Sequence, residues 1–283
     1  MKIAFNSGVF QHSSLTDAIG VISRSGFDGI EIMADRPHAL PAEMSAALLS
    51  ELQETLKTRR VTVCALDSMT SRRAGDILSP SWIEEDWEPR EQRIRYTLDC
   101  VRMAAALGIP YVITQGGGAV PASMNRREGW RLFVANMFRV LPLAKRLGVT
   151  LLIAPRPGTL IETSTHLTDL LKELHTEFEC AKVYFDAGAF YCSGEEPCEA
   201  WEILGSQVGM IRLADMPENR VYSPKPLGEG VLNIDSLLSC VRETAFDGYV
   251  SVLHDAKERS AEDTLAISVE YLHKMGFLEK ETP

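Results

Sequence analysis

The chain has 283 residues, of which 45% are hydrophobic and 24% charged, and a formal net charge of −10 at pH 7. This composition provides enough apolar residues for a core and excludes disordered, fibrous and collagen-like proteins. An acidic surface repels phosphate backbones, so nucleic acid is not an expected partner.

The cysteines and the N-terminal residues indicate the cellular compartment that we expect for this protein. The six cysteines form no CxxC pair and no regular framework, so we expect reduced thiols in a cytoplasmic protein and no zinc ribbon. The N-terminal residues MKIAFNSGVF lack a basic segment followed by an unbroken apolar one. No stretch approaches the roughly 18 apolar residues of a membrane span. We therefore expect no membrane partner; a homo-oligomer is left open.

Short apolar runs rich in β-forming residues alternate along the chain with longer stretches of helical spacing. The expected strands are residues 2–6, 29–33, 61–66, 111–115, 150–155, 182–186, 210–215 and 249–253. The expected helices are residues 15–25, 42–58, 90–107, 127–147, 165–176, 197–204, 234–244 and 261–275. Pro41 and Pro197 suit first helical positions, while Gly26, Gly108 and Gly148 suit the residue that closes a helix with positive φ.

This alternation predicts an α/β protein with a single (β/α)₈ TIM barrel over residues 1–283, because a strand-helix unit recurs eight times without a linker. The alternative is a doubly wound open sheet. That fold is disfavoured because the first strand-turn-helix contains no G-x-G-x-x-G and no acidic residue placed to hold a ribose. The glycines at 116–118 follow the fourth expected strand, and we interpret them as a tight loop at the barrel rim.

In such a barrel the reacting groups lie at the C-terminal ends of the strands, where alternate residues point inward. Polar and charged residues are frequent at these ends. The candidates, with two apolar residues at corresponding positions, are Glu31, Asp67, Ser68, Gln115, Ala154, Arg156, Tyr184, Asp186, Arg212, Asp215, Leu253, His254 and Asp255.

Several segments together resemble a known family. They are residues 26–31 (GFDGIE), 106–110 (ALGIP), 147–153 (LGVTLLI), 185–188 (FDAG), 213–215 (LAD), 228–230 (GEG) and 246–252 (FDGYVSV). In this order and spacing, over essentially the whole chain, they are similar to the xylose-isomerase-like barrels. This family includes sugar isomerases, sugar-phosphate epimerases, hydroxypyruvate isomerase and the family-two apurinic endonucleases. The resemblance implies the same barrel fold.

The resemblance also implies a metal centre that this sequence does not reproduce. Family members hold one divalent cation with Glu, Asp, His and Glu at the ends of strands five to eight, and the glutamates act as the acid/base pair. The corresponding residues here are Ala154, Asp186, Arg212 and Leu253. A single carboxylate does not replace the water shell of magnesium or manganese, so we expect no metal and no cofactor.

We expect metal-dependent isomerisation or epimerisation to be abolished and the central pocket to bind a different small molecule in the barrel mouth. Arg212 would place a permanent positive charge opposite Asp186, with Arg156 nearby. Asp186 and His254 are the predicted general bases. The predicted substrate-binding residues are Arg156, Arg212, Tyr184, Glu31 and Gln115.

Two histories would explain the altered strand ends. The substitutions concentrate at inward positions, whereas residues 157–163 and 228–230 keep the family pattern. We therefore favour an engineered variant, relined for a ligand or a metal-independent acid/base reaction. The alternative is a natural pseudoenzyme, or a binding or scaffold protein of the same fold.

Overall fold

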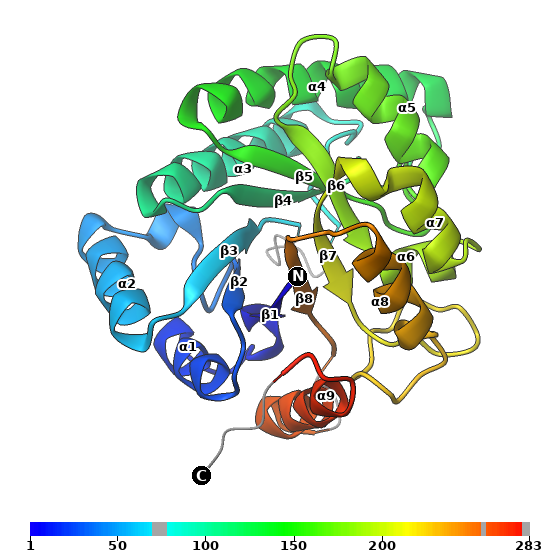
Figure 1. Cartoon of the computed structure of the whole chain (residues 1–283). Coiled ribbons are helices and arrows are strands. Elements are labelled where there is room, and N and C mark those ends of the chain that lie inside the picture. The colour runs from blue at the N-terminus through cyan, green and yellow to red at the C-terminus, as the bar shows by residue number, and fades with distance from the viewer. Residues whose placement is uncertain (70–77, 256–258, 279–283) are drawn as a thin grey trace.

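A computed structural model describes residues 1–69, 78–255 and 259–278. In these residues eight parallel strands, each paired with the next and β8 with β1, close a barrel (Figure 1). The strands are β1 (Lys2–Asn6), β2 (Gly29–Met33), β3 (Thr62–Asp67), β4 (Tyr111–Gln115), β5 (Thr150–Ala154), β6 (Ala181–Asp186), β7 (Val208–Leu213) and β8 (Tyr249–Val252). The predicted (β/α)₈ architecture is confirmed, and the doubly wound alternative is wrong.

Helices surround the barrel and alternate with its strands (Figure 1). Within the described ranges they are α1 (Leu15–Arg24), α2 (Ala46–Arg59), α3 (Trp87–Leu107), α4 (Arg126–Leu147), α5 (Ser164–Leu174), α6 (Ala187–Cys192), α7 (Pro197–Leu204), α8 (Ile234–Glu243) and α9 (Ala261–Lys274). The expected helices are found within a few residues of their predicted ends. The short helix α6 was not predicted.

The helix ends show which local signals were interpreted correctly. Gly108 and Gly148 both close helices with φ of 69°, as expected for residues without a Cβ. Pro41 instead begins a 3₁₀ turn, Pro41–Glu43, and α2 begins after Ser45, whose hydroxyl accepts from the Leu48 amide. A side-chain cap therefore decides where α2 starts.

The strands separate two layers of buried side chains. Outward-facing residues, including Phe5, Ile153 and Phe185, pack in the main core between the strands and the helices. Inward-facing residues, including Leu152 and Met210, form a second apolar cluster inside the barrel. This inner cluster lies below the polar strand ends, so the barrel is a packed core and its chemistry is confined to one end.

The triple-glycine loop after β4 has a structural role, in agreement with its interpretation as a rim loop. The Gly116 carbonyl accepts from Ile161 N at 3.0 Å and the Gly118 carbonyl from Leu160 N at 2.8 Å. Gly118 has φ of 95°, and a Cβ there would lie 2.3 Å from the Cβ of Ser81. Only glycine fits between these neighbouring loops.

The expectation of six reduced thiols is wrong. Cys198 of α7 and Cys240 of α8 form a disulfide, with their Cα atoms 6.3 Å apart, because the two helices pack side by side. Sequence spacing alone does not reveal this pairing, since 42 residues separate the two positions. In the described part of the chain, no helix combines the length and apolar character that crossing a membrane requires.

Candidate functional site

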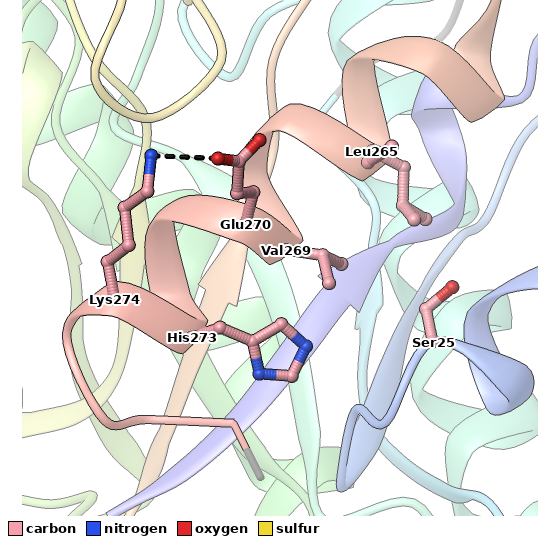
Figure 2. Close-up of a pocket in the computed structure, with 7 residues that line it drawn as sticks. Ser25, Leu265, Val269, Glu270, His273 and Lys274 are labelled. Atoms are coloured by element: carbon pink, nitrogen blue, oxygen red, sulfur yellow. Dashed lines mark ion pairs between the residues drawn. The ribbon is translucent and has the colours of Figure 1, made fainter. Parts of the chain in front are cut away.

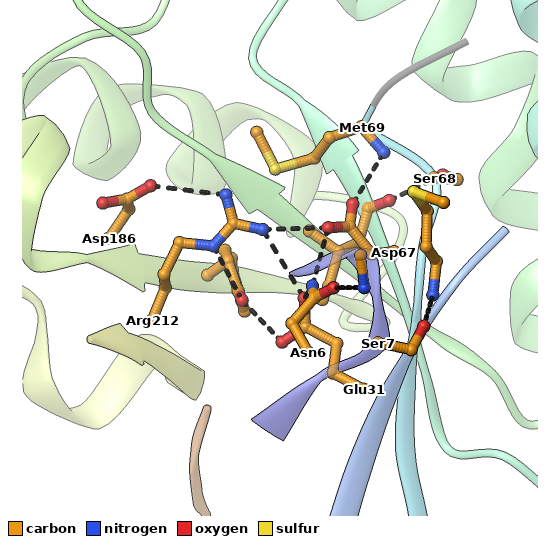
Figure 3. Close-up of polar contacts among 12 residues, drawn as sticks. Asn6, Ser7, Glu31, Asp67, Ser68, Met69, Asp186 and Arg212 are labelled. Carbon is orange, nitrogen blue, oxygen red and sulfur yellow. Dashed lines mark hydrogen bonds and ion pairs between the residues drawn. The ribbon is translucent and has the colours of Figure 1, made fainter. Parts of the chain in front are cut away.

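The guanidinium group of Arg212 lies at the centre of the polar strand ends (Figure 3). Its Nη2 is 2.9 Å from Asp67 Oδ2 and 3.5 Å from Glu31 Oε1. Its Nη1 is 3.7 Å from Asp186 Oδ2, and its Nε donates to the Tyr184 hydroxyl at 3.2 Å. Burial alone would lower the pKa of Arg212, but the surrounding acidic groups raise it well above its ordinary value. Arg212 is therefore a permanent cation.

Glu31 and Asp67 form the acidic side of this cluster. The Asn6 amide donates to Glu31 Oε1 and, at 3.1 Å, to Asp67 Oδ2, while the Tyr184 hydroxyl donates to Glu31 Oε2 at 2.7 Å. Burial raises the pKa of Glu31 to about 7; Arg212 opposes this shift and Asp67 reinforces it. Glu31 can therefore gain or lose a proton near neutral pH.

Asp186 ends β6 and caps the helix that follows. Its Oδ1 accepts from the Ala189 amide at 2.9 Å, which positions the carboxylate at the start of α6. Its Oδ2 accepts from the Tyr222 hydroxyl at 2.6 Å and also faces Arg212. Asp186 is fully buried, and Tyr222, from the loop between β7 and α8, covers it.

Arg156 follows β5 and approaches the same carboxylate. Its Nη1 lies 4.0 Å from Asp186 Oδ2, and its guanidinium carbon lies 4.0 Å from the centre of the Tyr222 ring. The residue is 7% exposed, yet its Nε and Nη1 have no hydrogen-bond partner in the described residues. The structure thus brings together Arg156, Asp186 and Arg212, as expected.

Two predicted site residues, His254 and Gln115, make no hydrogen bond to this cluster within the described residues. The imidazole ring of His254 packs edge-on against Phe5, an outward-facing residue of β1, with ring centres 5.5 Å apart. Burial lowers the pKa of His254 to about 4, so the ring is neutral at pH 7. Gln115 donates its amide to the carbonyls of Met69 at 3.4 Å and Leu78 at 3.0 Å, which ties these two residues to the end of β4.

Three further residues of the cluster had little or no sequence signal. Asp67 was a strand-end candidate without an assigned role, although it makes the shortest ion pair with Arg212. Asn6 is the last inward residue of β1, a position the strand-end rule could have identified. Tyr222 lies in a loop, and no pattern in the sequence marks it.

The strand ends do not fit a divalent cation. At the four positions where the resemblance implies ligands, Ala154 and Leu253 have no donor atom, and Arg212 brings its own positive charge to within 3.7 Å of Asp186. Across residues 1–69, 78–255 and 259–278, no group of three or more His, Cys, Asp or Glu side chains is arranged to hold a metal ion. The carboxylates here surround a guanidinium instead.

A separate groove of about 420 Å³ lies on the outer helical layer, between Ser25 at the end of α1 and α9. Figure 2 shows Leu265 and Val269 along this groove and the ion pair of Glu270 with Lys274, 2.8 Å long, beside it. Its residues are not part of the Arg212 cluster, which consists of Asn6, Glu31, Asp67, Tyr184, Asp186 and Arg212.

The model of the xylose isomerase-like TIM barrel family matches residues 19–275. The chain belongs to this family. A Methanocaldococcus jannaschii protein named uncharacterized protein MJ1311 is 24% identical over 290 residues, covering 96% of this chain and 89% of its own length.

Two solved structures of this barrel type share the fold. A D-tagatose 3-epimerase-like protein superimposes with a TM-score of 0.80 at 20% identity, covering 98% of each chain. The IolI protein with a bound zinc atom superimposes with a TM-score of 0.80 at 18% identity, covering 99% of this chain and 100% of its own. At this identity the likeness extends to the fold, while the strand-end residues of this chain determine its chemistry.

Proposed function

We propose that this member of the family moves a proton beside the carbonyl of a small sugar-like molecule without a divalent cation. The observation that supports this is the position of Arg212, whose guanidinium lies among three strand-end carboxylates and supplies a fixed positive charge. The proposal applies equally to an engineered chain and to a naturally diverged one, because it depends only on these residues.

In this proposal Asp186 is the general base. It removes a proton from the carbon next to the carbonyl, and the carbonyl oxygen becomes negatively charged as the enediolate forms. Arg212, close to Asp186, stabilises that charge electrostatically. The proton of the adjacent hydroxyl then moves to the former carbonyl oxygen, and Asp186 returns its proton to the carbon that carried the carbonyl, which completes an isomerisation. His254 takes no part, because it lies on the outer side of β1.

One observation favours a second candidate, a non-catalytic binding or scaffold protein. Asp186 is fully buried beneath Tyr222, so substrate reaches the carboxylate only when the Tyr222 side chain moves aside. If Tyr222 keeps this position, the charged cluster stabilises the barrel and performs no chemistry.

Deuterium exchange in D₂O distinguishes the two candidates. D-glucose, D-fructose and D-glucuronate are incubated with the protein and EDTA, and deuterium incorporation beside the carbonyl is followed by NMR. We expect incorporation by the unaltered chain and a loss of about a hundredfold or more in Asp186→Asn, because general base catalysis contributes about this much.

The matched control is Asp169→Asn, which makes the same change at an exposed position of α5 and should keep the original rate. Exchange that depends on an added divalent cation, or that survives in Asp186→Asn, would show that the mechanism is wrong. Absence of exchange with all three sugars would support the non-catalytic candidate.

A further inference from the structure

Arg156 differs from the other buried arginines in how its donors are used. Among the described residues three arginines are buried, Arg93, Arg156 and Arg212. Arg93 donates to three backbone carbonyls, and Arg212 contacts three carboxylates and a hydroxyl. Arg156 has two buried nitrogens, Nε and Nη1, without a hydrogen-bond partner in the described residues.

A buried guanidinium with unused donors is costly, because water no longer solvates the N–H groups and no protein acceptor replaces it. Stacking on Tyr222 at 4.0 Å covers one face of the guanidinium plane but satisfies no N–H group, since these donors point outward in that plane. The arrangement is therefore incomplete without an acceptor from outside the described residues.

We propose that Arg156 binds a carboxylate group of the substrate, so that the molecule processed by this site is a sugar acid or a related hydroxy or keto acid. This inference rests on the proposed function, since it names the substrate class of the same site. The planar guanidinium matches a carboxylate, which can accept from two N–H groups at once.

The charges of the cluster favour a carboxylate over a phosphate. Arg156 and Arg212 bring two positive charges, and Asp67, Asp186 and Glu31 lie 2.9, 3.7 and 3.5 Å from Arg212. Because Asp186 also stands 4.0 Å from Arg156 Nη1, the carboxylates already balance both arginines, and the cluster offers a ligand unused N–H donors without a surplus of positive charge. A phosphate monoester would add about −1.5 to −2 charges to this balanced cluster at pH 7, whereas a carboxylate adds only one.

Tyr222 contacts both Arg156, the proposed carboxylate anchor, and Asp186, the proposed base. Its ring stacks on Arg156, and its hydroxyl donates to Asp186 Oδ2 at 2.6 Å. When Tyr222 moves aside, it uncovers the anchor and the base together. A substrate bound through its carboxylate at Arg156 would therefore place the rest of its carbon chain beside Asp186.

Three probes that differ at one end of the same sugar test the inference by isothermal titration calorimetry at low ionic strength. D-glucuronate carries a carboxylate, D-glucose a neutral hydroxymethyl group, and D-glucose 6-phosphate a phosphate. We expect D-glucuronate to bind the unaltered chain about tenfold to a hundredfold more tightly than D-glucose, as a charge-assisted hydrogen bond to a buried group provides. D-glucose 6-phosphate should bind more weakly than D-glucuronate.

Arg156→Gln should remove the preference, so that D-glucuronate and D-glucose bind this variant with similar affinities. Arg156→Lys keeps the charge but loses the planar fork, so it should retain only part of the preference. The control is Arg220→Gln, because Arg220 also stacks on a tyrosine, Tyr191 at 4.6 Å, but lies outside the cluster. Circular dichroism and thermal melting establish that each variant is folded.

The inference is wrong if the unaltered chain binds D-glucuronate no better than D-glucose, if it prefers the phosphate, or if both Arg156 variants keep the preference. Its failure differs from that of the proposed function. Binding of D-glucuronate that depends on Arg156, without deuterium exchange, would support carboxylate binding by Arg156 and contradict the proposed proton transfer. Deuterium exchange at the same rate in the Arg156 variants would support the proton transfer and contradict carboxylate binding by Arg156.

Discussion

A charged residue inside a barrel is stable only when its partners compensate for the loss of water. Arg212 meets this condition, because carboxylates from β2, β3 and β6 surround a guanidinium from β7. Glu31 is the member of this cluster that titrates near neutral pH, and it is packed against Asn6, Asp67, Tyr184 and Arg212. Its protonation therefore couples the stability of the cluster to pH.

We predict that Glu31 makes the fold less stable as pH rises from about 4.5 to about 7. The pKa of this carboxyl is 4.5 in the unfolded chain and about 7 in the folded one, so the folded state holds the proton more tightly in this window. Between pH 4.5 and pH 7 the free energy of unfolding of the unaltered chain should fall by about 3 kcal/mol relative to that of Glu31→Gln, whose residue 31 does not titrate. Urea denaturation over this range measures the difference.

Comparing the unaltered chain with Glu31→Gln removes the effect of the other titrating groups, which both proteins share. One of these groups is His254, whose lowered pKa makes the free energy of unfolding rise with pH. Glu54→Gln, on an exposed position of α2, should follow the unaltered chain at every pH. A difference between the unaltered chain and Glu31→Gln that does not change with pH would contradict the prediction.

At the scale of elements, two features position the site. The first is the direct junction of β6 and α6, where Asp186 is both the last strand residue and the helix cap. The second is the packing of α7 against α8, which the disulfide between Cys198 and Cys240 joins covalently. The loop that carries Tyr222 enters α8, so this disulfide holds the C-terminal side of that loop to the barrel wall.

The disulfide should contribute about 4 kcal/mol to the free energy of unfolding, because closing a loop of this length restricts the unfolded chain. Cys240→Ser should therefore be less stable by about 2–4 kcal/mol under oxidising conditions, as measured by urea denaturation. Cys192→Ser, which leaves the disulfide intact, is the control.

Alkylation of the denatured chain, followed by mass spectrometry, tests the pairing itself. Four cysteines should react without a reductant and six after reduction. Reaction of all six without a reductant would contradict the disulfide.

At the scale of the whole molecule, closure of the barrel joins the two ends of the chain. β8 pairs with β1 over four residue pairs, from Lys2 with Tyr249 to Phe5 with Val252, and α9 packs outside them. The Arg212 cluster depends on this closure, because its groups come from β1, β2, β3, β6 and β7.

A chain ending at residue 248 should therefore fail to fold cooperatively. Without β8 and α9 both β1 and β7 become exposed edges, and the apolar residues packed on them lose their cover. Thermal unfolding by circular dichroism and size-exclusion chromatography should show a broad transition and aggregation. A permuted chain that begins at residue 249 and joins the original termini by a flexible linker should fold, because it keeps every strand pairing.

The fold was predictable to a large extent, because it depends on local periodicity. All eight strands were predicted within two residues of their ends, since short apolar runs and helical spacing arise from the burial of each segment. The helix α6 was missed because six residues are too few for a periodic pattern. The start of α2 was misplaced because the Ser45 cap outweighed Pro41.

The sequence by itself determined that the chain is a barrel of this family and that Ala154, Arg212 and Leu253 stand at its altered strand ends. These are properties of spacing and residue type. Only the tertiary structure decided which groups meet: Asp67 rather than Asp186 lies nearest to Arg212, Tyr222 covers Asp186, and His254 faces away. The physical reason is that the alternation of side chains along a strand determines only whether a side chain points into or out of the barrel. The tilt of the strands and the course of the loops determine which atoms come within 4 Å.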